Sequence, residues 1–347
     1  MFNLHSKLNQ FYNKHVRLKT EDRKKLAGYR DINQVRLESG LDKLGEKDGK
    51  KYAYPIRTCN QGSYAMHTLN QHPANDYDID VAQIFDKDDL PSSALDSRKR
   101  VAAAFQEVRA NFSREPEART NAVTVWYKEG YHIDFAIYRE YKDKNGQVII
   151  EHAGPDWKAA DPMAVTNWFN GEVTRLSPCK SYGAVEAGQM RRVVRFLKAF
   201  AKSRDSEAWN LPGGFIISTL VTECYRRDYY RDDKALYDTM VAIRRRLQGS
   251  LHVSNPVFTD QYLTYKQEFK NQVWRFGDKL GSAIAELNIL FNYDCTEAEA
   301  MKAWHWVFKH DFFLPEEVAN NSLSASYLSL GRLPGGPTTI NDTRTYG

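Results

Sequence analysis

Alternating apolar and polar residues mark β-strands in the first half of this chain of 347 residues. The segment 76–85 alternates over its first half, which predicts a strand with one polar face. Residues 121–127 and 131–138 are two runs rich in β-formers, joined by Lys-Glu-Gly, and they predict a hairpin. Further strands are expected near 53–60 and, at an edge, over 147–151.

Helical periodicity dominates the rest of the chain. Early helices are expected over 1–19, from Thr20 to about Leu44, and from Ser92 or Ser93 to about Phe112. After Asp161-Pro162 further helices are expected near 162–171, 185–203, 214–228, 233–248, 260–291 and 297–310, the last with a Thr296–Glu299 capping box. This order predicts an α+β fold, in which a mixed sheet with flanking helices precedes a helical domain.

The change from strands to helices predicts a domain boundary near 160–180. We expect residues 1–175 to form the sheet-containing core with the N-terminal helices, and residues 176–317 to form the helical domain. A cleft between the two would be a natural substrate site. The remaining segment, 318–347, is rich in Ser, Gly, Pro and Thr and is expected to be a poorly ordered tail.

Composition narrows the class of protein without identifying it. The net charge of +5 suits polyphosphate substrates, but it does not indicate a nucleic-acid activator. The four cysteines, at positions 59, 179, 224 and 295, form no Cys-x-x-Cys pair, which argues against a disulfide scaffold or a structural zinc site. The sequence begins with no apolar leader and contains no run of 18 apolar residues, so we expect a cytoplasmic protein without a membrane span.

Three aspartates are the candidate catalytic residues. Asp78 and Asp80 are two residues apart on a predicted strand, so their side chains leave the same face. Asp134 lies in the hairpin on the face of His132, between the apolar neighbours Ile133 and Phe135. A carboxylate in such a place is costly unless something pairs with it, and two Mg²⁺ ions, with Mn²⁺ as the alternative, would do so. Taken singly, the Asp-x-Asp pair could be a solvated edge and Asp134 a salt-bridged strand residue, and His132 is expected to be structural.

The segment Gln61-Gly62-Ser63 is a candidate phosphate-binding turn. It precedes a short helix expected over 64–69, whose first N–H groups would favour a phosphate. Gly62 permits close approach of the backbone, and Ser63 offers a hydroxyl. A Gly-Ser pair alone is also an ordinary turn, so the interpretation depends on its position upstream of Asp78 and Asp80.

A basic amphipathic helix is expected over 189–201. Arg191, Arg195 and Lys198 are spaced to share one face, from which Lys198 could reach a triphosphate. The arginines of this helix are expected on a solvated face. The same is expected of the basic clusters 98–100 and 244–246.

At these motifs the chain resembles the polymerase-β-like nucleotidyltransferase superfamily and, within it, the bacterial cGAS/DncV-like nucleotidyltransferases (CD-NTases). The similarity is specific in the phrase Gln61-Gly62-Ser63-Tyr64-Ala65-Met66-His67-Thr68-Leu69-Asn70, in Asp76-Tyr77-Asp78-Ile79-Asp80, and in His132-Ile133-Asp134. Arg195-Phe196-Leu197-Lys198-Ala199-Phe200 is similar to the family's triphosphate-binding helix. Elsewhere in residues 1–315 the resemblance is diffuse.

The resemblance implies a polymerase-β-like core and an enzyme that condenses nucleoside triphosphates, ATP among them, into a cyclic di- or trinucleotide second messenger. In bacteria such messengers serve anti-phage defence (CBASS). By the same resemblance Asp78, Asp80 and Asp134 bind Mg²⁺, with Asp134 helping to activate the attacking hydroxyl. Gln61, Ser63 and Lys198 would hold the donor triphosphate.

Two further positions bear on the resemblance. Family members often have a Ser after the Pro that follows the triphosphate-binding helix, whereas this chain has Gly213 there, and Ser218 is a weak substitute for that phosphate contact. The last residue, Gly347, is the type of residue through which some members are linked by a ubiquitin-ligase-like partner. Two alternatives stay open: a non-cyclising nucleotidyltransferase, of oligoadenylate synthase-like, tRNA or small-molecule type, and a catalytically silent binding module.

Overall fold

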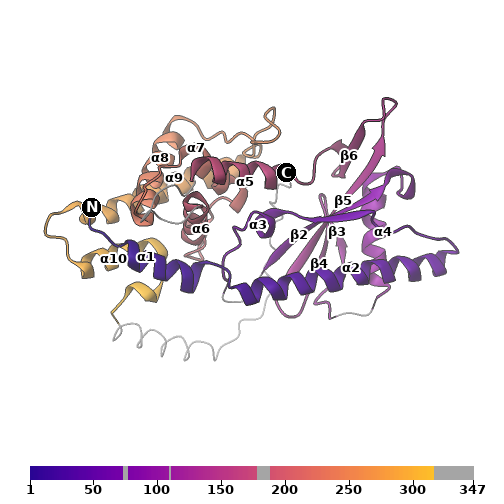
Figure 1. Ribbon diagram of the computed structural model, residues 1–347, viewed down its shortest axis with the longest axis horizontal. Coiled ribbons are helices and arrows are strands. Elements are labelled where there is room, and N and C mark those ends of the chain that lie inside the picture. Colours follow the sequence, from indigo (N-terminus) through magenta and orange to yellow (C-terminus); the bar gives the residue numbers. More distant parts are fainter. Residues whose placement is uncertain (73–76, 109–110, 178–187, 316–347) are drawn as a thin grey trace. The chain divides into compact units, whose positions relative to one another are not determined.

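A computed structural model of the chain describes residues 1–72, 77–108, 111–177 and 188–315 (Figure 1). The described residues form two compact units, of which one is Leu18–Asn170 and the other combines residues 1–17 with 171–315. The first unit carries the sheet and the second is helical. The predicted α+β fold, a mixed sheet with flanking helices plus further helices, is confirmed.

A mixed sheet forms the centre of the first unit. Its described strands are β1 (Arg57–Asn60), β2 (Asp78–Asp86), β3 (Glu117–Ala118), β4 (Val123–Trp126), β5 (His132–Lys142), β6 (Val148–Ala153) and β7 (Trp157–Ala159). The order is β1-β2-β5-β4-β3, and β6 pairs with both β5 and β7. Strands β2 and β5 run parallel, whereas the other described pairs are antiparallel. The predicted hairpin is β4–β5. The strand expected over 147–151 is β6, but its expected edge position is wrong, because β6 pairs with β5 on one side and β7 on the other.

Helices cover one face of this sheet. Helix α2 (Thr20–Asp48) runs along it, and α4 (Ala94–Gln106) packs beside α2 (Figure 1). Both helices contribute to one hydrophobic core with the alternate residues of β2 and β5. Helix α4 begins where the sequence predicts, because the Ser93 side chain accepts a hydrogen bond from the Asp96 N–H. The short helix α3 (Gly62–Ala65) lies between β1 and β2 in the chain.

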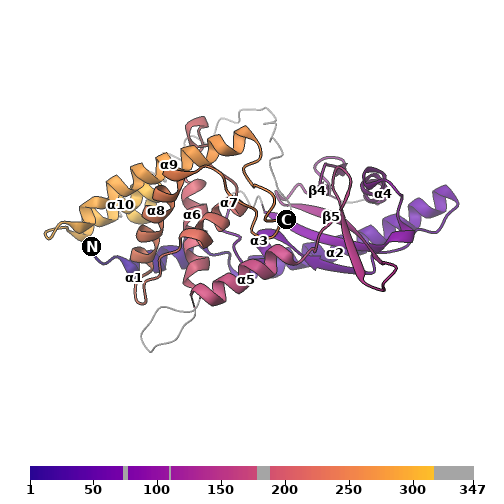
Figure 2. The same cartoon turned by 90° about the horizontal axis from the view of Figure 1, so that it is seen from above.

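The second unit is built from helices. They are α1 (His5–Phe11), which continues as a π-helical turn over Tyr12–Val16, then α6 (Gln189–Ala201), α7 (Gly214–Cys224), α8 (Asp232–Gly249), α9 (Gln267–Leu287) and α10 (Glu297–Phe308). Helix α9 packs against α8 and α10 (Figure 2). Short 3₁₀ turns occur in this unit at Glu207–Trp209, Asn288–Phe291 and Asp311–Phe313, and in the first unit at Lys87–Asp89. The predicted Thr296–Glu299 capping box is confirmed, whereas the helix expected from 260 begins only at Gln267.

Residues 1–17 pack with the helical unit, although the sequence grouped them with the sheet. The Leu4 N–H donates a hydrogen bond to Asp233 at 2.9 Å, and the Phe11 ring packs on Phe308 at 4.9 Å. Helix α5 (Ala164–Leu176) continues without a break across the division between the two units at residue 170. The domain limits expected from the sequence, 1–175 and 176–317, therefore stay a prediction.

Several predictions concern residues outside the described ranges. The tail 318–347 with Gly347, and also Asp76 and Cys179, lie there. Among the described helices, none combines the length and the apolar composition that a membrane span needs.

Candidate active site

The parallel pairing of β2 with β5 brings the predicted aspartates together. Asp80 is directly beside Asp134 in the register of the two strands, and Asp78 is directly beside His132. Neighbouring strands are about 4.8 Å apart, and residues in register point to the same face. The three carboxylates, which are up to 56 positions apart in the chain by their numbering (134 minus 78), therefore share one face of the sheet.

Three of the side chains on this face form a candidate metal site. Asp78, His132 and Asp134 each offer a ligand atom, and these atoms lie within 4.8 Å of one another. His132 Nε2 lies 3.2 Å from an oxygen of Asp78. Asp134 is 2% and His132 7% exposed, so these two are shielded from solvent, whereas Asp78 is half-buried and stays partly accessible. Because Mg²⁺ prefers oxygen ligands, the carboxylates suit the ion and His132 is well placed to orient Asp78.

Asp80, which is outside this group of three, lies against the turn that follows β1. Gly62 has a left-handed backbone (φ +59°), and a Cβ there would be 1.8 Å from Asp80 Oδ2. The Gln61 N–H donates to the Asp80 carbonyl at 2.8 Å. Any side chain at position 62 would therefore both strain the backbone and displace a carboxylate. The sequence predicted the need for glycine here, but for approach to a phosphate rather than to Asp80.

Thr124 is a site residue that the sequence analysis missed. It is in register with Asp134 across the β4–β5 hairpin, and its hydroxyl donates a hydrogen bond of 2.5 Å to Asp134 Oδ1. Thr124 is 1% exposed, so this bond is protected from water. The sequence predicted the hairpin itself. Identifying Thr124 as the partner of Asp134 also requires the pairing register of its two strands, which depends on the turn geometry.

Gln61 and Ser63, the predicted triphosphate contacts, differ in what they can offer. Gln61 is 6% exposed, and its amide nitrogen donates to Tyr138 at 3.0 Å and to the Pro162 carbonyl at 2.7 Å. These bonds favour a role for Gln61 in holding the turn. Burial raises the pKa of Tyr138, which keeps that phenol neutral as the partner of Gln61. Ser63 is half-buried on α3, whose first N–H groups have no acceptor within the helix.

Lys198 lies on α6 in the helical unit. A Cβ on Gly214 would be 3.0 Å from Lys198 Cε, so the lysine side chain runs over the first residue of α7. The Pro-Gly-Gly segment, noted in the sequence as a departure from the family, thus leaves room for this lysine. The structure places Lys198 at a half-buried position.

Ser218 and two arginines of α6 are not placed as the sequence suggested. Ser218 is fully buried and donates to the Gly214 carbonyl at 2.8 Å, a geometry that supports a structural role and not the predicted phosphate contact. The solvated face expected for the arginines is wrong for Arg192, which pairs with Asp232 at 2.7 Å, and for Arg195, which donates to Tyr12 at 2.6 Å. Burial of a long polar side chain requires such partners, which lie far away in the sequence.

Arg98 is a further correction in the sheet unit. It was expected on a solvated face, but it is 3% exposed and donates a hydrogen bond of 2.6 Å to the Ala153 carbonyl. The guanidinium therefore joins α4 to the end of β6.

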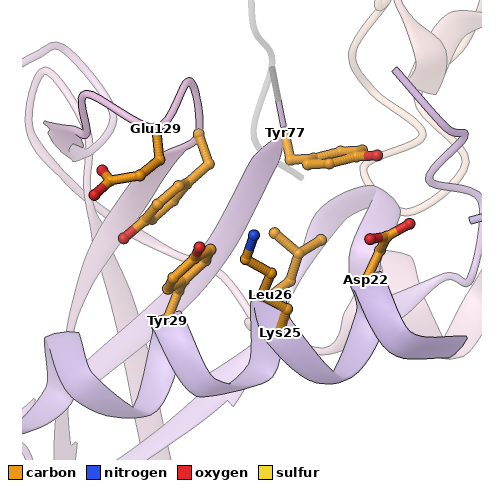
Figure 3. A pocket seen from close by; sticks show the side chains of 7 residues that line it. Asp22, Lys25, Leu26, Tyr29, Tyr77 and Glu129 are labelled. Atoms are coloured by element: carbon orange, nitrogen blue, oxygen red, sulfur yellow. The ribbon is translucent and has the colours of Figure 1, made fainter. Parts of the chain in front are cut away.

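A pocket in the sheet unit lies against helix α2 (Figure 3). Its lining residues come from α2 and from the residues just before β2 and β5; they are Asp22, Lys25, Leu26, Tyr29, Tyr77, Glu129 and Tyr131. Tyr29 and Tyr131 stack face to face at 3.9 Å. Tyr77 and Tyr131 belong to the hydrophobic core, whereas their neighbours Asp78 and His132 point the other way. This pocket is therefore separate from the aspartate cluster.

Comparison with known proteins agrees with this geometry. Residues 56–138, which include all three aspartates and the Gly62 turn, match the family model described as the cyclic GMP-AMP synthase DncV-like nucleotidyltransferase domain. The sheet unit is thus a nucleotidyltransferase domain. Within it, residues 56–138 match the DncV-like model, and the resemblance drawn from the motifs is confirmed.

Solved structures extend the match in fold to most of the chain. Vibrio cholerae DncV cyclic AMP-GMP synthase, in complex with the linear intermediate 5′ pppA(3′,5′)pG, is 15% identical with a TM-score of 0.66, over 88% of this chain and 95% of that one. Escherichia coli MS115-1 CdnC with ATP is 18% identical with a TM-score of 0.62, over 89% and 98%. Escherichia coli DncV bound to 3′-deoxy GTP is 17% identical with a TM-score of 0.62, over 86% and 93%. At these identities the likeness concerns the fold.

Proposed function

We propose that this protein condenses nucleoside triphosphates into a cyclic di- or trinucleotide with release of pyrophosphate. The observation that carries the proposal is the convergence of Asp78, Asp80 and Asp134 on one face of the parallel β2–β5 pair. Structural relatives such as the Vibrio cholerae enzyme are cyclic dinucleotide synthases that bind nucleotides, which supports the same reaction class here.

The three aspartates would hold two Mg²⁺ ions, or Mn²⁺, and bound cations of this kind favour an ionised attacking hydroxyl and neutralise charge on the leaving pyrophosphate. The oxygen donors of Asp78 and Asp134 and their spacing fit such ions. Asp134, which accepts a hydrogen bond from the Thr124 hydroxyl, would accept the proton of the attacking hydroxyl. The first turn of α3 with Ser63 would bind the donor phosphates, and Lys198 would add a positive charge.

The reaction takes place in two steps of the same kind. A hydroxyl oxygen of one nucleotide forms a bond to the α-phosphorus of another, the bond from that phosphorus to the β-phosphate oxygen breaks, and pyrophosphate leaves. The linear product then reorients, and a second attack closes the ring with loss of a second pyrophosphate. Positioning and fixed charges supply most of the acceleration in phosphoryl transfer, and a preformed row of carboxylates meets that need.

We extend the proposal to a cytoplasmic role in anti-phage defence (CBASS), as the family resemblance implies. Linkage of Gly347 by a ubiquitin-ligase-like partner remains a prediction.

The test is incubation of the purified protein with the four NTPs and Mg²⁺ or Mn²⁺, followed by phosphatase treatment and mass spectrometry. We expect phosphatase-resistant cyclic products that disappear with EDTA and in the double variant Asp78→Ala, Asp80→Ala. The exposed Asp156 provides a matched control, and Asp156→Ala should retain full activity. Products that phosphatase degrades would favour a non-cyclising nucleotidyltransferase. Activity in the double variant would overturn the assignment of the site.

A further inference from the structure

A tryptophan lies on the same face of the sheet as the aspartates. Trp126 ends β4 and is in register with His132, which is itself beside Asp78. Thr124, two residues earlier on the same strand, bonds to Asp134, so alternation places the Trp126 side chain on the aspartate face. The half-buried indole of Trp126 on β4 therefore lies next to His132 on β5, which in turn lies next to Asp78 on β2.

Two arginines cover this indole. The Arg114 guanidinium carbon is 3.3 Å and that of Arg119 is 5.8 Å from the centroid of the Trp126 ring. Backbone pairing fixes both segments, because the Ser113 N–H donates to the Trp126 carbonyl at 2.9 Å and the Arg119 N–H donates to the Ala122 carbonyl at 2.8 Å. The two guanidinium groups are therefore placed by the edge of the sheet and not by a free loop.

The charges around the indole favour an anion. Partial burial, and then the positive charge of Arg119, lower the pKa of Arg114, while Glu117 acts in the opposite sense. Like charges held on one ring repel each other, and a bound anion relieves that repulsion. Arg114 is nevertheless exposed enough to meet a ligand. Paired guanidiniums match the geometry of a phosphate through two parallel N–H donors.

The order of the strands indicates whether the two arginines face the phosphates of the donor or those of the acceptor nucleotide. The sheet runs β1-β2-β5-β4-β3, so the aspartates of β2 and β5 lie between the Gly62–Ser63 turn that follows β1 and Trp126 on β4, with Arg114 and Arg119 next to it on either side of β3 in the chain. The donor triphosphate is assigned to the turn. Strand β4, which carries Trp126, is about 10 Å, or two strand spacings, from β2, which carries Asp78. This distance suits the 5′-phosphates of a nucleotide whose ribose hydroxyl is at the aspartates.

We infer that Arg114 and Arg119, held on Trp126, bind the 5′-phosphate chain of the acceptor nucleotide. This inference rests on the proposed function and adds a substrate contact to it. Trp126 acts as a positioning residue for the two arginines, and the arginines distinguish a nucleotide acceptor from a bare nucleoside.

The experiment uses two nucleotide analogues, of which one can act only as the donor and the other only as the acceptor. A 2′,3′-dideoxy-NTP has no hydroxyl to attack with and only donates, whereas an α,β-methylene NTP has no cleavable bond at its α-phosphorus and only accepts. Pyrophosphate release from this pair reports formation of one bond. The acceptor is varied between the methylene NTP and the corresponding nucleoside, with adenine and guanine bases tested in turn.

We expect wild type to prefer the phosphorylated acceptor, and Arg114→Gln and Arg119→Gln each to raise the acceptor KM about tenfold or more, as loss of a charge-assisted hydrogen bond predicts. The donor KM and kcat should change by about twofold or less, which a general structural role would not predict. Trp126→Leu should raise the acceptor KM in the same direction. Arg139, whose guanidinium carbon is 4.2 Å from the Trp157 ring in the same sheet, is the matched control, and Arg139→Gln should leave the acceptor KM unchanged.

Two failures are distinguishable. If wild type joins no pair of nucleotides, the proposed function fails. If wild type joins them but the Arg114 and Arg119 variants leave the acceptor KM unchanged, or raise the donor KM equally, this inference is overturned while the proposed function stands. Thermal melting of each variant excludes misfolding as the cause.

Discussion

The two faces of strands β2 and β5 are made of neighbouring residues but have opposite character. On one face Ile79, Ile133 and Phe135 are fully buried in the core under α2 and α4. On the other face Asp80 and Asp134 are also nearly buried, but they are charged. The degree of burial therefore does not distinguish core residues from site residues in this sheet. The chemical type of the buried side chain distinguishes them.

This difference between the two faces indicates that the apolar face provides stability and the aspartate face provides function. The apolar face is stabilised by the removal of hydrocarbon from water. The aspartate face brings like charges together, which opposes folding. The hydrogen bond from Thr124 to Asp134 and the contact of His132 with Asp78 offset part of that cost. A fold commonly tolerates such a local conflict at a functional site. Variants on the two faces should accordingly separate activity from stability.

The largest effect is expected from Asp134→Asn. The asparagine oxygen can still accept from Thr124, but the charge is lost, so activity should fall at least about a thousandfold because metal-ion catalysis contributes several kcal/mol. The melting temperature should stay the same or rise, because repulsion between carboxylates decreases. Pyrophosphate release and thermal melting measure the two quantities, and a large loss of stability would contradict the contrast between the faces.

Phe105→Ala should show the opposite behaviour. Phe105 on α4 is fully buried and stacks on Phe135 at 4.9 Å, so its truncation should destabilise the protein by about 3–5 kcal/mol. Activity per folded molecule should change by no more than about twofold. Val148, 48% exposed on β6, is the control in the same sheet, since Val148→Ala should cost less than about 0.5 kcal/mol. Urea unfolding compares the variants.

His152 should make the sheet unit sensitive to acid. Burial, reinforced by the nearby charge of Arg98, lowers the pKa of His152 from 6.5 to about 4, despite a hydrogen bond to the Asn121 carbonyl. The unfolded chain then binds a proton that the folded chain does not, so stability is lost as the pH falls from about 6.5 towards 4. The loss should be about 2–3 kcal/mol.

The His152→Gln variant isolates this contribution. Urea midpoints of wild type and variant at pH 7 and pH 4.5 should show a steeper decline for wild type. Equal declines would mean that His152 titrates alike in the folded and unfolded chain.

Gly62→Ala tests the junction between turn and carboxylate. Gly49, at the end of α2, is also left-handed (φ +63°), but a Cβ there meets nothing within 4 Å. Both alanine variants should therefore lose about 1 kcal/mol from backbone strain. Only Gly62→Ala displaces the Asp80 carboxylate, so it alone should reduce activity, by about tenfold or more. Equal activity of the two variants would contradict the role given to this contact.

Thr124→Val should have the smallest effect. The swap preserves shape and removes the hydrogen bond to Asp134, which is worth about 1 kcal/mol, so activity should fall roughly three- to tenfold. Thr124→Ser, which restores a hydroxyl, should recover most of the loss. No recovery with serine would point to packing of the methyl group instead.

The sequence predicted much of this site because the relevant signals are local. The spacing of Asp78 and Asp80 within one strand shows by itself that they share a face, and the hairpin places Asp134 on a strand. The sequence analysis missed the role of Thr124 and the contact of Arg114 with the Trp126 ring, because both depend on the register between strands. The burial of Arg98 was predicted wrongly, because a basic cluster on a helix gives no sign of a distant carbonyl group that accepts its hydrogen bonds.

By itself, the sequence determined which residues alternate, where glycine was required, and which carboxylates could meet an ion, because these properties follow from chain periodicity and side-chain chemistry. Only the tertiary structure decided that β2 pairs with β5 in parallel and in the register that sets Asp80 beside Asp134. It likewise decided that residues 1–17 pack with the helical unit. The physical reason is that pairing between distant segments is selected by the fit of whole surfaces, and no local pattern encodes that fit.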